Sequence, residues 1–361
     1  MFKLSILLFS LISLNSYGKI NPKKELSAFG RVSIMTHYED SDLSLEDSGS
    51  RIGLYAQKKL TKKFRAYAKG EWAFNSVNNT ADLSIGNDNK YTSTDAAQTF
   101  RRRLGFVAFD LDTYGELRFG KQWSVYSDVS HYTDDFNLFG GSASGTYNLR
   151  TDGGQSGTGR VSHGVTYRNQ FWGIKYGLQA KLIKNKELTL DSNSSGVTAK
   201  DSYGMMIQRA FGKFHMGIAY NQIDLEGDEN AISGYDGGNS WSSVLGLKYV
   251  GDFTTIAFVY NRSKNHEIDD GTTIFDGEGQ ELILSYKFTE KLNFKMGYNL
   301  LADFDNDLED NEYQREYYIV GASLKPHRDI KLFIEGRSNQ SKSLDGDKGN
   351  DSAGVGAVLY F

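Results

Sequence analysis

The sequence contains no cysteine and only two prolines, Pro22 and Pro326. The absence of cysteine excludes a disulfide framework and thiolate metal sites, and it leaves the cellular compartment open. After the N-terminus, no apolar run reaches 18 residues, so no helical membrane span is expected. Charge of one sign is also lacking, since 41 Lys and Arg stand against 45 Asp and Glu, which gives a net charge of −4. This balance argues against a nucleic-acid partner.

Motifs of catalysis are missing as well. No G-x-S-x-G or H-E-x-x-H occurs, and the six histidines are spread from His37 to His327. The stretch HYTDD at 131–135 places one histidine beside two carboxylates, but a metal site needs ligands that converge in space. The glycine-rich runs at 141–145 and 152–159 lack the strand, lysine and helix of a phosphate cradle. We therefore expect no enzyme, no cofactor and no metal.

Glycine and aromatic residues are abundant instead, with 39 Gly, 22 Tyr and 22 Phe. Together they favour many strands joined by tight turns over helical layers. The average hydropathy is that of a soluble protein. A barrel with a polar interior has the same average, because only alternate residues face lipid.

The first 18 residues have the pattern of a secretory signal peptide. A lysine precedes a short apolar run from Leu4 to Leu14, and small residues follow at Ser16 and Gly18. The alternative is an anchor helix, but a run of about eleven residues is too short to span a bilayer. We predict cleavage after Gly18, export, and one β-barrel domain over 19–361.

Alternation of apolar and polar residues with period two recurs along the whole remaining chain. In the clearest case Phe214, Met216 and Ile218 share one face, while His215 and Gly217 lie on the other. Sixteen strands are predicted, at 26–38, 50–60, 63–74, 99–109, 114–122, 160–168, 172–184, 201–210, 213–223, 241–250, 252–262, 278–288, 291–301, 313–324, 329–337 and 351–361.

The connections between these strands alternate in length. Short turns such as 251–252 and 289–290 follow long polar loops such as 224–240 and 263–277. Outer-membrane barrels have short turns at one rim, long loops at the other and an even number of strands. Closure also removes the sheet edges that hydrocarbon could not satisfy. The pattern predicts an all-β, 16-stranded antiparallel transmembrane β-barrel.

One stretch, from Gly120 to Asn169, interrupts the alternation. About 35 of its residues show neither strand nor helix pattern, and structureless loops of that length are uncommon and usually functional. We expect this stretch to fold into the barrel and narrow its lumen, which would make the protein a channel.

Several motifs resemble the general diffusion porins of Gram-negative outer membranes. The resemblance covers essentially the whole mature chain and is strongest from about 99 to 180. It rests on SRIGL at 50–54, RLGFVAFD and YGELRFGKQ within 103–122, YTDDFNLFGG at 132–141, GRVSHGVTYRNQFWG at 159–173 and the terminal LYF. It implies a homotrimer in outer-membrane lipid, whose inward-folded third outer loop narrows a water-filled channel for ions and small hydrophilic solutes.

The resemblance also implies a constriction with a basic wall and an acidic loop. The basic positions match Arg31, Arg51, Arg103 and Arg160, and the loop positions match Asp134, Asp135, Phe139, Gly140 and Gly141. The strand pattern agrees, because each arginine opposes the apolar face of its strand, and an arginine facing lipid at mid-membrane costs about 2–4 kcal/mol. Where these porins often have Pro-Glu before FGG, this chain has Asn137 and Leu138. A constriction carboxylate is thus expected to be missing, which leaves the sign of ion selectivity open.

The last strand ends in an aromatic residue, Phe361, where a frayed polar terminus is usual. The resemblance implies that Phe361 is an assembly signal read by the barrel-assembly machinery. Two other functions stay open. A substrate-specific porin would use lumen aromatics such as Trp123 and Tyr132 to bind an oligosaccharide or another nutrient. A non-conducting receptor or adhesin would have no use for a constriction loop.

Overall fold

The computed structural model describes residues 25–77, 83–84, 90–91, 100–148, 151–183, 186–190, 193–229, 231–269, 273–304, 313–343 and 348–361. The predicted signal peptide over 1–18 lies outside these residues. Within the described ranges, no helix is both long and apolar enough to cross a membrane.

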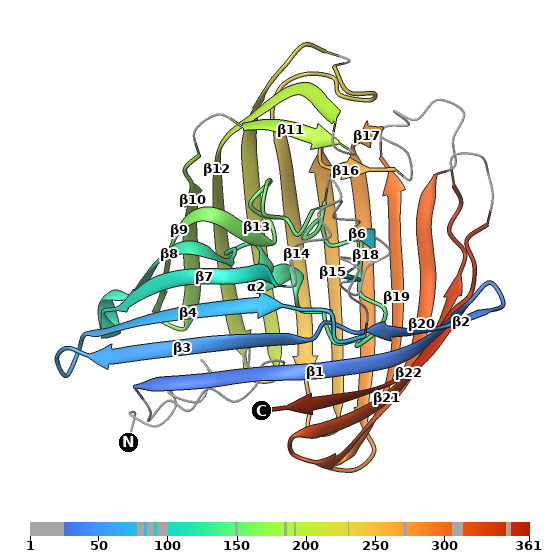
Figure 1. Ribbon diagram of the computed structural model, residues 1–361. Coiled ribbons are helices and arrows are strands. Elements are labelled where there is room, and N and C mark those ends of the chain that lie inside the picture. The colour runs from blue at the N-terminus through green and yellow to red at the C-terminus, as the bar shows by residue number, and fades with distance from the viewer. Residues whose placement is uncertain are drawn as a thin grey trace.

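Among the described residues, eighteen antiparallel strands pair in one sheet, which closes on itself where β1 pairs with β22 (Figure 1). Two of them, β2 (Asp42–Asp47) and β11 (Lys186–Leu190), are hairpin extensions, so sixteen form the wall. The wall strands are β1 (Leu26–Glu39), β3 (Arg51–Lys59), β4 (Arg65–Ala73), β7 (Arg101–Asp110), β8 (Glu116–Trp123), β9 (Arg160–Phe171), β10 (Ile174–Lys181), β12 (Asn193–Phe211), β13 (Phe214–Glu226), β14 (Ser240–Val250), β15 (Thr254–Lys264), β18 (Gly277–Lys287), β19 (Leu292–Asp303), β20 (Gln314–His327), β21 (Ile330–Asn339) and β22 (Ser352–Tyr360).

The predicted sixteen-stranded barrel is confirmed, and most strand ends agree within a few residues. The main difference is β12, which begins at Asn193 because its first residues pair with β11 in a hairpin above the wall. The small elements between wall strands were not predicted. They are β5 (Leu83–Ser84), β6 (Lys90–Tyr91), β16 (Glu267–Ile268), β17 (Ile274–Phe275), a 3-10 turn η2 (Asp112–Tyr114) and the one-turn helix α2 (Ser127–Ser130).

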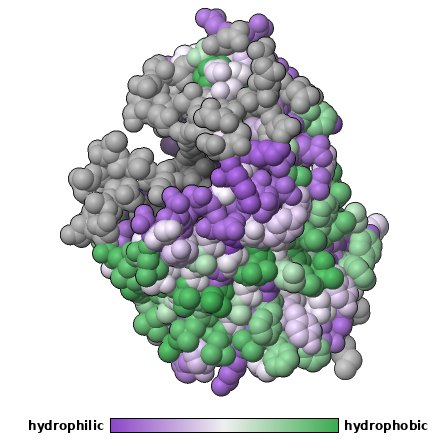
Figure 2. Space-filling model, turned by 90° about the vertical axis from the view of Figure 1, so that its right-hand side faces the viewer, coloured by the Kyte–Doolittle hydropathy of each residue, from purple (hydrophilic) through white to green (hydrophobic). Residues whose placement is uncertain are grey.

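The two faces of the wall have opposite chemistry. On β13, Phe214, Met216 and Ile218 point outward and are exposed, whereas Gly217 and Ala219 are buried against the interior. The same alternation recurs around the barrel, and Figure 2 shows an apolar band with a polar surface above it. An outward apolar band over a polar interior is the arrangement that a membrane barrel needs.

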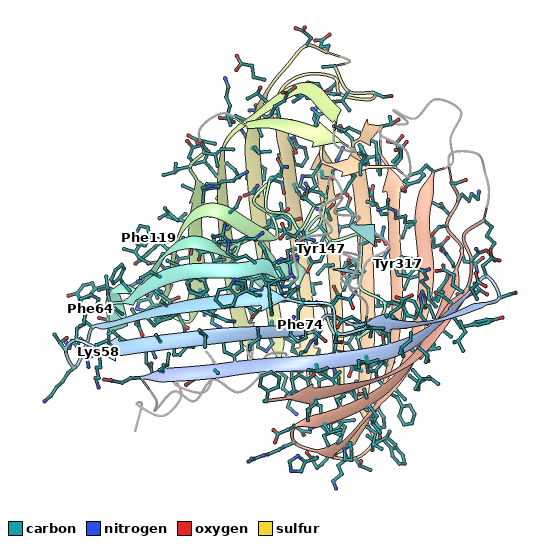
Figure 3. All side chains as sticks on the ribbon, in the orientation of Figure 1. Lys58, Phe64, Phe74, Phe119, Tyr147 and Tyr317 are labelled. Atoms are coloured by element: carbon teal, nitrogen blue, oxygen red, sulfur yellow. The ribbon has the colours of Figure 1, made fainter. Side chains whose placement is uncertain are left out.

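Tight turns and aromatic rings gather at one rim of the barrel. Gly212, between β12 and β13, has φ +62°. Phe64, Phe109 and Phe119 form a row of neighbouring rings, with centroids 6.0 and 6.2 Å apart, and Phe64 and Phe119 lie toward the turn at Lys58 (Figure 3). Aromatic girdles of this kind mark the level where hydrocarbon meets headgroups.

Candidate functional site

The connection from β8 to β9, described for residues 124–148 and 151–159 and called the inner segment below, runs inside the ring of wall strands (Figure 1). It contacts inward side chains of the wall. Its first turn is α2, and the Tyr126 hydroxyl donates to the Ser144 carbonyl at 2.8 Å within the segment. The same hydroxyl lies 2.7 Å from Ser242 Oγ on β14. Small side chains on β13 and β14 make this approach possible, because a Cβ on Gly217 or Gly246 would lie 2.9 or 2.8 Å from the Val129 methyl groups.

Glu335 on β21 is the main anchor of the inner segment. Its carboxylate accepts hydrogen bonds from the backbone amides of Asn137 at 2.8 Å and Leu138 at 2.7 Å, and from the Asn137 side-chain amide at 2.5 Å. Glu335 is buried, and charge-assisted bonds of this kind are about twice as strong as neutral ones. These hydrogen bonds hold Asn137 and Leu138, at the tip of the inner segment, against β21.

Glu281 on β18 is a second anchor. It accepts a hydrogen bond from the Thr133 hydroxyl and another from the Ala143 amide at 3.0 Å. Gly141 passes so close that a Cβ there would lie 2.3 Å from the Glu281 carboxylate. Any larger side chain at Gly141, one of the predicted loop positions, would therefore clash with Glu281.

The tip of the inner segment packs on an apolar patch of the wall. Leu138 and Phe139 are buried, and their neighbours there are Met35, Tyr317, Ile319, Phe333 and Val358. The Gly140 carbonyl accepts a hydrogen bond from the Tyr317 hydroxyl at 2.7 Å, and Figure 3 shows Tyr317 inside the barrel. Position 138 thus belongs to the packing of the segment on the wall. The absence of a constriction carboxylate at this position stays a prediction.

His266 holds a further part of the segment, at Gly145 and Asn148. It lies in the outer loop after β15 and is buried. Its Nε2 lies 2.9 Å from the Gly145 carbonyl, which makes Nε2–H the donor, and Asn148 Nδ2 donates to Nδ1 at 2.9 Å. Burial lowers the pKa of His266 to about 4. The neutral imidazole therefore joins an outer loop to the inner segment.

Two of the four predicted arginines form one cluster with residues that the prediction lacked. Arg51 and Arg103 point inward and are largely buried. Arg103 Nε lies 2.9 Å from a carboxylate oxygen of Glu71 on β4, and Lys69 Nζ lies 3.2 Å from the other oxygen. Glu71 and Lys69 follow the same inward parity as Gly53 and Arg51 on β3, so alternation alone could have identified them.

Arg31 adjoins this cluster, and Arg160 lies in a separate one. Arg31 is opposite Arg51 in the β1–β3 register and donates from Nε to the Gly49 carbonyl at 2.9 Å. Arg160 Nε lies 3.2 Å from Asp152 Oδ2, which Lys121 Nζ approaches at 2.9 Å. Burial alone would raise the pKa of the Asp152 carboxyl, but Arg160 and Lys121 lower it to about 2. Arg160 is thus matched by a carboxylate of the inner segment itself.

The two predicted loop acids, Asp134 and Asp135, are exposed, and they approach lysines of the wall. Asp135 Oδ1 lies 3.1 Å from Lys295 Nζ on β19, and the same ammonium group donates to the Asp135 carbonyl. Lys248 on β14 donates to the Tyr132 carbonyl at 3.2 Å. No expectation from the sequence included these lysines, although both stand at inward positions of their strands.

The remaining predicted residues have structural partners. Phe139 lies under the Arg337 guanidinium, with 5.2 Å from Cζ to the ring centroid. Trp123 packs edge-on against His131 at 4.6 Å between centroids, and Arg160 lies over its ring. Phe361 exchanges two backbone hydrogen bonds with Gly30, at 2.9 and 3.1 Å, and its ring lies where a Cβ on Gly30 would be. Phe361 thus completes the seam between β22 and β1.

Comparison with known families and proteins gives a consistent result. The model of the family described as Gram-negative porin matches residues 23–342. Outer membrane porin PhoE of Klebsiella pneumoniae is 26% identical over 349 residues, which is 93% of this chain and 92% of that protein. Outer membrane porin PhoE of Citrobacter freundii is 27% identical over 354 residues, 96% of this chain and 93% of that protein.

Solved structures show the same fold. Salmonella typhi OmpF in complex with daunomycin superposes with a TM-score of 0.78 at 19% identity, covering 95% of this chain and all of that one. The trimer form of OmpT from Vibrio cholerae gives a TM-score of 0.66 at 13% identity, covering 93% of this chain and 99% of the other.

Proposed function

This chain belongs to the Gram-negative porin family, and we propose that its inner segment and the basic wall opposite form the constriction of a weakly ion-selective diffusion channel. Porins of this family are outer-membrane channels for the passive diffusion of ions and small hydrophilic solutes, and this chain is one of them. They are channel proteins and not enzymes. The assignment of particular residues to the narrowest part of the channel is our proposal.

The observation that carries this proposal is the double anchoring of the inner segment. Glu335 and Glu281 hold its tip on one side of the lumen, and Arg31, Arg51 and Arg103 stand on β1, β3 and β7. Screening at about 0.15 M salt decays over roughly 8 Å, so only charges near the path act strongly on an ion. A unit charge at 4 Å contributes about 1 kcal/mol in water. Such energies bias permeation without excluding either sign.

We propose that the functional assembly is a homotrimer. The support is the family and the trimer form in which OmpT of Vibrio cholerae is known. Unheated protein in a mild detergent gel should migrate as a compact oligomer and shift to about 40 kDa on boiling. A band at the monomer position without heating would contradict the trimer.

Reversal potentials in a salt gradient test the constriction. Neutralising Arg103 and Arg160 should move the potential toward cation preference, because each change leaves a carboxylate, Glu71 or Asp152, without its arginine partner. Asp134→Asn should shift the reversal potential toward anion preference. Asp228→Asn, on an exposed outer loop, is the control and should change little. Equal effects of Asp228 and Asp134 would place the narrowest passage elsewhere.

A further inference from the structure

A set of lysines on the wall beside the inner segment has no counterpart in the basic wall predicted from sequence. Lys248, Lys295 and Lys331, called the lysine arc below, stand on β14, β19 and β21 and point inward. Lys295 is almost completely buried beside Asp135, and Lys248 contacts the Tyr132 carbonyl. The side of the lumen that holds the acidic loop therefore carries positive charge of its own.

The arc is continuous with the basic wall across the closing seam of the barrel. Lys331 on β21 pairs with Val358 on β22, and Val358 pairs with Ser33 on β1. Arg31 lies two residues from Ser33 on the same face of β1. Arg31, Lys295 and Lys325 all act electrostatically on Lys331, and Asp135 acts on it with the opposite sign. Cationic side chains thus follow the lumen from β3 through β1 and β21 to β19.

Carboxylates on the same strands do not balance this charge. Among the described residues of β14, β15 and β18 to β22, the inward carboxylates are Glu281, Glu335 and, at the outer end of β19, Asp303. Glu281 and Glu335 are buried and receive amide and hydroxyl hydrogen bonds from the inner segment, so they face its backbone and not the passage. Of the two acids at the tip, Asp135 is paired with Lys295.

We propose that the lysine arc makes this channel anion-preferring, so that its favoured solutes are small anions with carboxylate or phosphate groups. The inference rests on the proposed channel function and adds the sign of its selectivity. An anion passing the tip of the inner segment meets the ammonium groups of Lys248 and Lys331 on one side and guanidinium groups on the other, while Lys295 is paired with Asp135. A cation meets Asp134 and the already paired Asp135.

Lys331 gives the sharpest test, because the hydrogen bonds that anchor the segment come from other residues. Reversal potentials should be recorded in planar bilayers under a gradient of KCl, and again with potassium gluconate and potassium phosphate. The reversal potential of the wild type should indicate a preference for chloride over potassium. Lys331→Gln should lower the chloride-to-potassium permeability ratio by about two- to fivefold. Lys331→Arg should restore it, and Lys213→Gln, at an exposed turn where Lys213 pairs with Asp252, should change nothing.

Three outcomes would overturn the inference: reversal at zero or on the cation side in the wild type, an unchanged ratio in Lys331→Gln, or an equal effect in Lys213→Gln. Heat-shifted migration of each variant on gels shows that the barrel has folded. A folded barrel that gives no conductance steps would refute the channel function itself, and that result is distinct from a conducting channel with the wrong sign.

Discussion

Glu335 is a buried carboxylate that positions the inner segment without facing the passage itself. Its partners include backbone amides at the tip of the inner segment, so it acts on the position of that segment. Glu281 does the same at Thr133 and at Ala143, which are ten residues apart in the segment. Neither residue contributes charge to the passage, yet both determine where Asp134 and Asp135 stand.

Glu335→Gln should loosen the inner segment. The amide keeps one acceptor oxygen but loses the charge, and each hydrogen bond to a charged group contributes about 1.5–3 kcal/mol. We expect larger and noisier single-channel currents, together with proteolytic cleavage within the segment. Glu290→Gln, at an exposed turn, is the matched control. Quiet currents of wild-type size in Glu335→Gln would show that the tip is held by its apolar contacts instead.

At the scale of single residues, the sequence predicted which side chains face the lumen better than it predicted their interaction partners. Alternation placed Arg51 and Arg103 on the inner face because a strand reverses its side chains at each residue. Arg103 pairs with Glu71 across the neighbouring strands β7 and β4, and Glu335 pairs with the segment across 197 residues of sequence, and local pattern specifies neither contact. The packing of Leu138 could not be predicted for the same reason, because the apolar patch that receives it is built from β1, β20, β21 and β22.

At the scale of elements, the barrel closes at the seam between β22 and β1, and the inner segment is attached to its surroundings at several points along its length. β22 closes the sheet on β1, and Phe361 extends that pairing by two backbone hydrogen bonds to Gly30. Strand ends and parity could be predicted from local pattern. The hairpin of β11 with β12 and the course of the inner segment could not, because tertiary contacts and not periodicity determine them.

Removing Phe361 should lower the fraction of assembled barrel in the outer membrane while export continues. The deletion removes the last pairing of the seam and exposes the backbone of Gly30. Quantifying heat-shifted protein in outer-membrane fractions measures the effect, with Phe361→Tyr as the conservative control. Assembly of the deletion variant at the wild-type level would refute a role for Phe361 as an assembly signal.

Acidification should weaken the attachment of the inner segment to the outer loop at His266. The folded pKa, about 4, lies below the ordinary value of 6.5, so the released state binds the proton more readily. The attachment is therefore fully present above about pH 6.5 and is lost as pH falls toward 4. The protection factors of amides 145–148, which correct for the slower intrinsic exchange at low pH, should fall over that window, and His266→Gln should remove this pH dependence. Protection of 145–148 that stays constant from pH 7 to pH 4 would contradict the assignment.

At the scale of the molecule, a closed wall with an apolar outer band surrounds a polar interior, and we propose that the connection from β8 to β9 narrows it. The number of strands and the rim with short turns followed from the sequence, and the identity of the narrowing segment stays a prediction. Membership in the Gram-negative porin family agrees with them. The charge along the passage required the structure, because it depends on which carboxylates the inner segment occupies.

The absence of cysteine permits the most direct test of the central claim, that the inner segment borders the conducting path. Asp134→Cys places a single thiol at its exposed tip, and Asp228→Cys places one on an outer loop. A bulky, positively charged thiol reagent should produce a stepwise fall in single-channel conductance and a further shift toward anions with Asp134→Cys only. Unchanged conductance after complete modification at 134, or an equal fall at 228, would contradict the account.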